Sequence, residues 1–379
     1  MPTRILVDLL GFTGERGGTE TYARELLTRL PGCLPDARWV ALVGRAGADR
    51  VRAFFPGPVR VIPWVGADAV SWAAGAVGVT AVFAHTTGAD VVWAPANFGP
   101  IFRGAPRVVT VHDAIYDDVP GTALRRAVRT GTSFLMRRSA RTADRVITVS
   151  RSAAHAIEHH FAVPRDRIEV VPNGSSDPRP VADARAVLTS LGVGSERRIL
   201  MSTGNRMPHK NFEGLLEALA TIPRTDRPLT VIAGSRSPDP LLRTVERLGL
   251  TADVVLPGWI GDAELEALYQ VADLYVCPSL VEGFGLPVVD ALRRRVPVLA
   301  NDIPVLREVG GSVVRYTDAT SPVIFGAAIT TCLRDQPDDA ALERAASWAD
   351  NFSWAASARA TGDVLLRTAR ERSPAGRAS

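Results

Sequence analysis

The sequence predicts an α/β chain in which two doubly wound parallel sheets form separate domains. Short apolar runs alternate along the chain with amphipathic or glycine-containing segments, a pattern typical of parallel strands covered by helices on both faces. Proline and glycine cluster from Pro172 to about residue 182, which indicates a linker. A chain of 379 residues with 46% apolar composition can bury a core on each side of that linker. We therefore expect a first domain over 1–178, a second over 179–352, and a helix with a flexible tail over 353–379.

Strands of the first domain are expected where short apolar runs are bounded by turn residues. They are Ile5–Leu10, Trp39–Val43, Val59–Ile62, Val91–Trp93, Val108–Val111, Val146–Val149 and Ile168–Val171. The first is followed by a glycine-rich loop, residues 11–18, whose glycines permit positive φ and close approach of a ligand. A dinucleotide fingerprint would need the spacing G-x-G-x-x-G, which this loop lacks, so we do not favour a dinucleotide site there.

His112 and Asp113 directly follow the strand Val108–Val111. Ligands of doubly wound sheets bind outside the carboxyl ends of the strands, so both residues lie at a binding edge. A lone histidine is more often structural than functional, and by itself this position would favour the structural role.

The segment Leu124–Arg145 holds seven arginines and one acidic residue among apolar residues. We favour a solvated helix whose arginines suit the negative end of the helix dipole. The alternative is a basic amphipathic face that meets anionic lipid, and the segment lacks the continuous apolar face that this would need.

The second half repeats the alternation of strands and helices. Its expected strands are Ile199–Thr203, Leu229–Ala233, Val254–Leu256, Leu274–Cys277 and Val298–Ala300, with helices near 211–220, 239–247, 262–271, 286–294 and 303–309. Arg206 and Lys210 straddle the turn after the first of these strands, so we expect both charges to converge on one diphosphate. Lys210 is the one lysine among 44 basic residues, which suggests that its compact charge is required.

The stretch from Pro278 to Asp302 organises the site. The strand Leu274–Cys277 leads into Glu282-Gly283-Phe284-Gly285, and Pro287 stands where the first turn of a helix tolerates it. Glycines and a helix start suit a phosphate. Glu282 before the helix and Asp290 inside it are poor phosphate ligands but accept hydrogen bonds from sugar hydroxyls, so the stretch predicts a nucleotide-sugar site.

Composition excludes several classes of protein. The net charge of +4 does not imply a nucleic-acid partner. Three widely spaced cysteines argue against a disulfide framework and a zinc site. There is no apolar run of about 20 residues and no cleavable signal pattern, so we expect a cytoplasmic protein, at most peripheral to the inner face of a membrane. No two aspartates are separated by a single residue, so a D-x-D metal clamp is absent and we expect no metal and no resident cofactor.

The motifs S-T-G-N-R-M-P-H-K-N, V-H-D and E-G-F-G-L-P, with the second acid at Asp290, resemble glycosyltransferase family 4. The family has the GT-B fold, in which two Rossmann-like domains face a central cleft, and its last helix crosses back to the first domain. Asp290 replaces the family's glutamate, and Arg295 stands where the family usually has glycine. By resemblance, the catalytic residues are His112, Arg206, Lys210 and Glu282. The donor-binding residues are Gly17, Gly18, Trp259, Ile260, Gly283, Phe284, Gly285, Leu286 and Asp290.

The resemblance implies a retaining, metal-independent transfer of a hexose from a nucleotide-diphosphate sugar to a hydroxyl acceptor, with a leaning toward mannosyl- or rhamnosyl-like donors. The acceptor would be a glycan, a lipid-linked glycan or a small natural product. A sugar phosphorylase of the same fold would need a lysine for pyridoxal phosphate, and Lys210 is already assigned. A non-catalytic nucleotide-sugar or glycan-binding protein remains the alternative, because Asp290 and Arg295 depart from the family's pattern.

Overall fold

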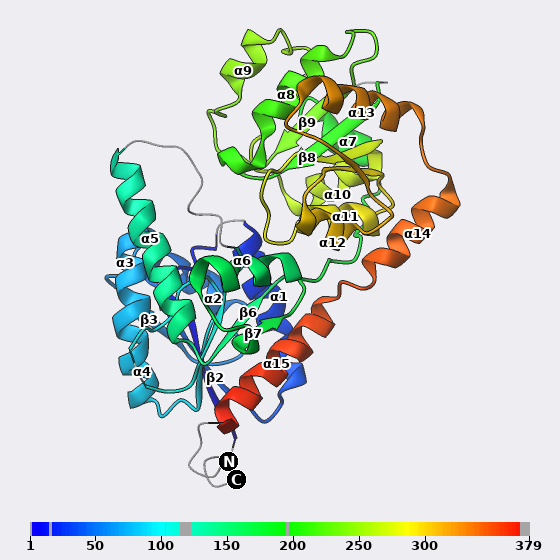
Figure 1. The fold of residues 1–379 in the computed structure, drawn as a ribbon. Helices are drawn as coiled ribbons and strands as arrows, with labels where there is room; N and C mark the ends of the chain where they lie inside the picture. The colour runs from blue at the N-terminus through cyan, green and yellow to red at the C-terminus, as the bar shows by residue number, and fades with distance from the viewer. Residues whose placement is uncertain (1, 15–16, 103, 114–122, 195–196, 372–379) are drawn as a thin grey trace. The chain divides into compact units, whose positions relative to one another are not determined.

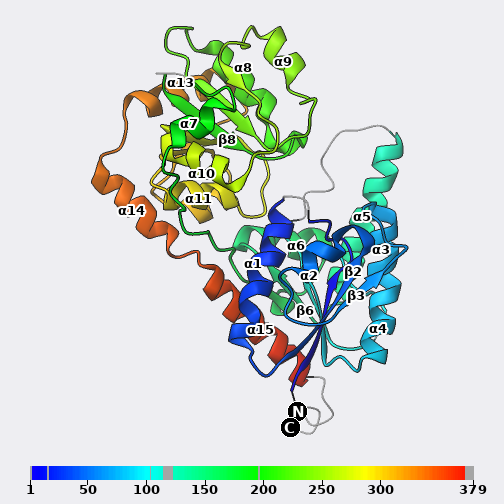
Figure 2. The same cartoon turned by 180° about the vertical axis from the view of Figure 1, so that it is seen from behind.

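The computed structural model describes residues 2–14, 17–102, 104–113, 123–194 and 197–371 (Figures 1 and 2). The chain forms two compact units: unit 1 comprises Met1–Gly174 and Phe352–Ser379, and unit 2 comprises Ser175–Asn351. The sequence predicts these boundaries after residues 178 and 352. The structure divides the chain after Gly174 and after Asn351.

Unit 1 is built on a seven-stranded parallel sheet in the order β3-β2-β1-β4-β5-β6-β7. The strands are β1 (Arg4–Leu9), β2 (Arg38–Gly44), β3 (Val59–Ile62), β4 (Val91–Ala94), β5 (Arg107–Thr110), β6 (Arg145–Thr148) and β7 (Ile168–Val170). Strands β4 and β5 are buried along their whole length, as expected for a sheet covered on both faces. The strand order reverses between β1 and β4, and this reversal is the switch point of a doubly wound sheet.

Helices cover both faces of this sheet. They are α1 (Gly18–Cys33), α2 (Ala48–Arg52), α3 (Ala69–Ala74), α4 (Thr80–Thr86), α5 (Ala123–Thr142), α6 (Arg151–Phe161) and α15 (Trp354–Glu371). Figures 1 and 2 show α15, the last helix of the chain, running beside α1, and α4 on the other side of the sheet. The ring of Trp354 lies 6.3 Å from that of Tyr22, and Ser357 Oγ donates to the carbonyl of Pro172 at 2.5 Å.

Unit 2 is built on a six-stranded parallel sheet in the order β10-β9-β8-β11-β12-β13. The strands are β8 (Ile199–Thr203), β9 (Leu229–Ala233), β10 (Val254–Val255), β11 (Leu274–Cys277), β12 (Val298–Asn301) and β13 (Arg315–Thr317). The order reverses between β8 and β11, which defines the second switch point. Strand β13 was not expected, because Arg-Tyr-Thr at a sheet edge lacks an apolar run.

The helices of unit 2 include three that were not expected from the sequence, α7, α13 and α14. The full set is α7 (Ala184–Thr189), α8 (Phe212–Thr221), α9 (Leu242–Arg247), α10 (Asp262–Val271), α11 (Leu286–Arg293), α12 (Pro304–Gly310), α13 (Pro322–Arg334) and α14 (Asp339–Ala349). Helix α8 packs against α13, and α11 packs against α14. Within the described ranges, the helices are too short or too polar to cross a bilayer.

Candidate active site

The loops at the switch point of unit 2 carry the residues that the sequence analysis singled out. Lys210 lies on the loop that follows β8, and Glu282 lies on the loop that follows β11. These two strands are hydrogen-bonded neighbours at the point where the strand order reverses. Ligands of such sheets bind outside the carboxyl ends of the strands at this reversal. The topology therefore places both side chains where a ligand of this sheet is expected.

Lys210 and Glu282 meet in a short ion pair. The distance from Lys210 Nζ to Glu282 Oε1 is 2.6 Å, and the two side chains are 18% and 12% exposed. Ser279 Oγ donates to the same carboxylate oxygen at 2.8 Å. The carboxylate is thus oriented by a cation and a hydroxyl from two different loops, while part of the pair stays open to solvent.

Backbone and side-chain hydrogen bonds tie three loops of this edge together. The amide of Leu280 donates to the carbonyl of His209 at 2.8 Å, which joins the loops after β8 and β11. Asn301, the last residue of β12, donates from Nδ2 to the carbonyl of Ser279 at 3.0 Å. Burial and the charge of Lys210 lower the pKa of His209. The ion pair therefore sits on a frame of mutually bonded loops.

Helix α11 begins at this edge, directly after the glycine loop. Gly285 has φ 95°, a left-handed conformation that side chains rarely adopt, and Pro287 lies in the first turn as expected. Phe284 is 4% exposed and anchors the loop in the core, and Gly283 is also buried. Leu286 begins the helix. The positive, amino-terminal end of the α11 dipole thus follows Glu282 closely in the sequence.

Arg206 has a different partner from Lys210, and its expected convergence with Lys210 on one diphosphate stays a prediction. Its guanidinium is 6% exposed and forms a bidentate ion pair with Asp239, with Arg206 Nη2 at 2.7 Å from Asp239 Oδ2. It also donates to the carbonyls of Gly204 and Ile232, each at 2.8 Å, and stacks over the ring of Phe212 at 4.9 Å. Since each of its three nitrogens donates inside unit 2, Arg206 holds this loop together.

Asp290 lies on α11, where its carboxylate bonds to the start of unit 2. Ser175 Oγ donates to Asp290 Oδ1 at 2.7 Å, and Arg294 Nη1 lies 3.6 Å from the same oxygen. Burial raises the pKa of Asp290, although Arg294 and Ser175 oppose the shift. The side chain remains 28% exposed. Asp290 therefore has a structural partner as well as an open side.

The remaining positions of unit 2 differ in exposure. Trp259 is 45% exposed on the loop after β10, whereas Ile260 is buried beside it. Arg295 has φ 58°, in the left-handed region that favours glycine. That conformation suits the glycine expected there from the resemblance.

In unit 1, His112 follows β5 as expected and is 9% exposed. Its Nε2 lies 2.9 Å from the carbonyl of Pro95, which follows β4 at the first switch point. Because a carbonyl only accepts, Nε2 carries the proton and Nδ1 is an acceptor. Burial lowers the pKa of His112 to about 4, against the opposing effect of the Pro95 carbonyl. Its amide donates to Asn97 Oδ1 at 2.8 Å.

Gly17 and Gly18, the glycines expected to bind the donor, lie at the start of α1. Gly17 caps α1 with φ 172°, extended backbone that any residue adopts, and Gly18 is the first helical residue. In this loop the left-handed conformation occurs at Gly14, with φ 75°. What Gly17 provides is space, since an added Cβ would meet no atom within 4 Å.

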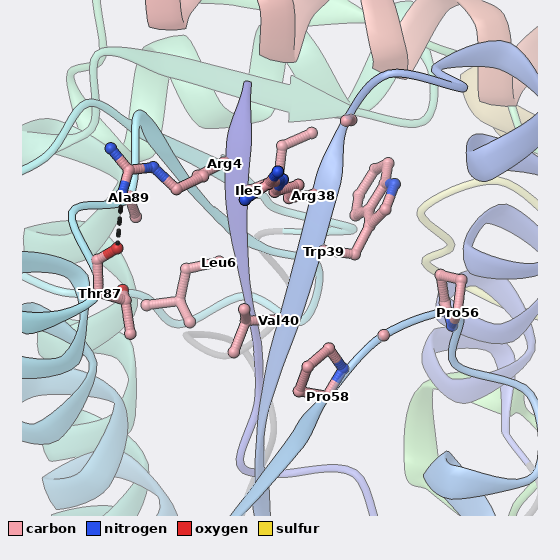
Figure 3. Close-up of a pocket in the computed structure, with 12 residues that line it drawn as sticks. Arg4, Ile5, Leu6, Arg38, Trp39, Val40, Pro56, Pro58, Thr87 and Ala89 are labelled. Atoms are coloured by element: carbon pink, nitrogen blue, oxygen red, sulfur yellow. Dashed lines mark hydrogen bonds between the residues drawn. The ribbon is translucent and has the colours of Figure 1, made fainter. Parts of the chain in front are cut away.

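A cavity of about 400 Å³ lies away from these groups (Figure 3). It is lined by the amino ends of β1 and β2, including Arg4 and Arg38, and by Pro56 and Pro58. The chemistry-bearing residues follow the carboxyl ends of the strands, so this cavity is separate from the site. Over the ranges that the structure describes, no three His, Cys, Asp or Glu side chains gather as metal ligands would.

Sequence reasoning missed three residues that shape the two edges: Asn97, Asp239 and Ser279. Asn97 has φ 64°, and asparagine is enriched among residues with positive φ. Ser279 lies three residues before Glu282, close enough for a local hydrogen bond. Asp239 lies 33 residues from Arg206, so no local pattern could have paired them.

Two family models together match most of the chain. A family model described as Glycosyltransferase Family 4 matches residues 16–176, and one described as Glycosyl transferases group 1 matches residues 187–348. O-antigen chain mannosyltransferase B of Escherichia coli is 31% identical over 274 residues, which are 70% of this chain and 71% of that protein. D-inositol 3-phosphate glycosyltransferase of Streptomyces avermitilis is 31% identical over 244 residues, 59% of this chain and 51% of that protein.

Solved structures share the architecture at low identity. WaaG, a glycosyltransferase involved in lipopolysaccharide biosynthesis, has a TM-score of 0.73 at 16% identity and covers 96% of this chain and 99% of its own. HepE of Anabaena, solved with UDP-glucose, has a TM-score of 0.72 at 20% identity with the same coverage. These likenesses establish the GT-B fold. Together with the mannosyltransferase relative and the two family models, they show that the chain is a glycosyltransferase and belongs to family 4.

Proposed function

We propose that this glycosyltransferase moves a hexose, with retention of anomeric configuration and without a metal ion, from a nucleotide-diphosphate sugar to a hydroxyl acceptor. The observation that carries the proposal is the Lys210–Glu282 pair at the switch point of unit 2, beside the start of α11. A cation, a helix start and a glycine turn suit a diphosphate, and a carboxylate suits sugar hydroxyls.

Lys210 is a cation at this edge that can turn to a leaving diphosphate. We infer that Lys210 and the amide groups at the start of α11 stabilise the phosphate charge, while Arg206 is bound to Asp239. Ser279 still orients Glu282 when Lys210 turns to a phosphate, because its hydroxyl donates to the same oxygen. The pair can therefore divide its two charges between the phosphate and the sugar.

The transfer step is proposed to be a displacement on one face of the sugar. The bond from the anomeric carbon to the phosphate oxygen breaks, and the bond to the acceptor oxygen forms on the same face. The acceptor's proton passes to the departing phosphate oxygen. Cys277 is buried and its pKa is raised to about 12, so it stays a thiol and not a covalent nucleophile.

His112 is proposed to act as a neutral hydrogen-bonding group. Its protonated Nε2 is held by Pro95, which leaves Nδ1 to accept from a hydroxyl of the donor sugar. A neutral ring at this position adds no positive charge beside the reacting carbon.

The donor sugar and the acceptor are proposals by likeness. The relatives in the comparison are named mannosyltransferases and an inositol-phosphate glycosyltransferase, and a structural neighbour was solved with UDP-glucose. We favour a mannose-type hexose and an acceptor hydroxyl on a glycan or a polyol. Contact with a membrane surface is the weaker proposal. In its support, α5 exposes Phe134 (63%), Arg138 and Arg141, whereas the side chains of residues 123–129 lie outside the described part.

The experiment begins with thermal stabilisation by UDP, GDP and their hexose derivatives. A ligand at a hundred times its Kd stabilises the folded state by ~2.7 kcal/mol. The best donor then serves to compare Glu282→Gln, expected to lower kcat, with Asp290→Asn, expected to raise KM while kcat changes less.

Glu213→Gln, an exposed carboxylate in the first turn of α8, is the matched control. Equal losses of kcat for Glu282→Gln and Asp290→Asn, or a thermal defect alone at 290, would contradict the proposed division of roles.

A further inference from the structure

Helix α11 joins the glycine loop to both places where the chain passes between the two units. Its first residue follows Gly285, and its last residue is Arg293. The chain leaves unit 1 after Gly174 and returns after Asn351. Two consecutive arginines at the end of α11, Arg293 and Arg294, bond to the residues beside these two crossings.

At the first crossing, α11 holds Ser175 and Ser176. Ser175 Oγ donates to Asp290 Oδ1 at 2.7 Å, and Arg294 Nη1 donates to the carbonyl of Ser176 at 3.2 Å. Arg293 adds a longer pair with Asp177 at 3.4 Å. Two of these three bonds involve buried or half-buried groups, so they order the first residues of unit 2.

At the second crossing, Arg293 holds the end of α14. Its Nη2 donates to the carbonyl of Ala349 at 2.9 Å, and its Nη1 lies 3.1 Å from Asp350 Oδ1. Ala349 is fully buried, two residues before the chain returns to unit 1.

The helix between these ends is fixed in place. Val288, Val289, Ala291 and Leu292 are each fully buried. Arg294 donates to Glu266 at 2.9 Å and stacks over the ring of Tyr269 at 5.0 Å. A short, well-packed helix with anchored ends transmits a change at one end to the other.

We propose that α11 couples nucleotide binding to the two chain crossings, with Asp290 and Arg294 as the positioning residues. The coupling rests on the proposed function, in which Asp290 accepts hydrogen bonds from the ribose of the donor. A carboxylate has room for several donors, so ribose hydroxyls on its open side leave Ser175 bound to Oδ1. Fixing the carboxylate then strengthens its bonds to Ser175 and Arg294, which orders the first crossing.

The experiment measures hydrogen exchange in the full chain with UDP alone and GDP alone, each at saturation. Whichever nucleotide binds is expected to slow exchange of the amides at 175–177 by about 5-fold or more, at the lower end of common coupling factors. Because coupling is reciprocal, Ser175→Ala should raise the Kd of the same nucleotide by a similar factor. Ser176→Ala is the matched control, since its carbonyl and not its hydroxyl is held by Arg294.

Arg334→Gln provides a second control, because Arg334 pairs with its neighbour Asp335 at the end of α13. Nucleotide binding with unchanged exchange at 175–177, or an unchanged Kd in Ser175→Ala, overturns this inference and leaves the proposed function standing. Failure of every nucleotide to bind overturns both.

Discussion

Replacing Arg206 should damage the stability of unit 2 far more than its affinity for a nucleotide. The guanidinium and the carboxylate of Asp239 are 6% and 5% exposed, and they bond in a bidentate arrangement. Removing one partner of such a buried pair leaves an uncompensated charge and costs about 3–5 kcal/mol. Arg206→Met is therefore expected to lower the free energy of unfolding of unit 2 by that amount.

A second substitution, at Asp239, tests whether the lost stability comes from the unpaired carboxylate charge. In Arg206→Met/Asp239→Asn the buried negative charge is gone, while the asparagine oxygen still accepts the amide of Leu241, which bonds to Asp239 at 3.0 Å. Replacing both members of a buried pair is often close to neutral. The double variant should recover most of the lost stability.

Hydrogen exchange of amides in β8 and β9 is the direct assay, because Arg206 binds the carbonyls of Gly204 and Ile232 at the ends of these strands. Isothermal titration with the nucleotide then reports binding by the folded fraction. An Arg206→Met protein with wild-type exchange rates and no nucleotide binding would refute this role and restore the phosphate role expected from the sequence.

Four further predictions follow from groups described above. Lys210→Arg should lower kcat although the charge is kept, because a planar guanidinium does not replace a compact ammonium beside Glu282; wild-type kinetics would contradict this. Transfer assayed in excess EDTA should proceed at the same rate, and a requirement for added Mg²⁺ or Mn²⁺ would count against the proposed site. Because the pKa of His112 lies at about 4, its ring is neutral above that pH. We therefore expect His112→Gln to remove no limb near pH 6.5 from the pH profile of kcat/KM. Asp8 is buried and accepts from Thr80 Oγ1 at 2.6 Å, and burial raises its pKa from 3.8 to about 6. At about 1.36 kcal/mol per pH unit, ionisation of Asp8 costs the folded state about 3 kcal/mol above pH 6 and nothing below pH 3.8. Asp8→Asn should therefore gain stability relative to wild type as pH rises from 4 to 6, and urea denaturation at both pH values checks the sign.

The strands were the most predictable part of the fold. All twelve expected strands coincide with an observed strand within one residue at each end, because each run, such as Val91–Trp93, is apolar and bounded by turn residues. Val254–Leu256 is shorter in the structure, and the polar edge strand Arg315–Thr317 carries no such signal. The parallel direction of the strands also followed, since alternation of strands with helices is typical of a parallel sheet.

The partners of charged side chains were not predictable from the sequence. The R-x-x-x-K spacing suggested that Arg206 and Lys210 act together, but the partner of each comes from a loop remote in the sequence, Asp239 for Arg206 and Glu282 for Lys210. The local sequence determines on which loop a charged residue lies. Which carboxylate its side chain meets depends on the order of the strands, because that order decides which loops are neighbours. The spacing therefore did not reveal that Arg206 has a buried carboxylate partner in this structure.

Helix α15 belongs to unit 1 but is synthesised after all of unit 2. Unit 2 is one continuous stretch, Ser175–Asn351, whereas unit 1 needs α15, which packs on α1 and places Trp354 against Tyr22. Domains generally fold as they leave the ribosome, with the first one ahead. Here the first 174 residues emerge early but lack a helix that covers their own sheet, so the later unit is free to finish before the earlier one. We therefore expect that a chain ending before residue 352 leaves open the apolar face that α15 covers in the complete unit.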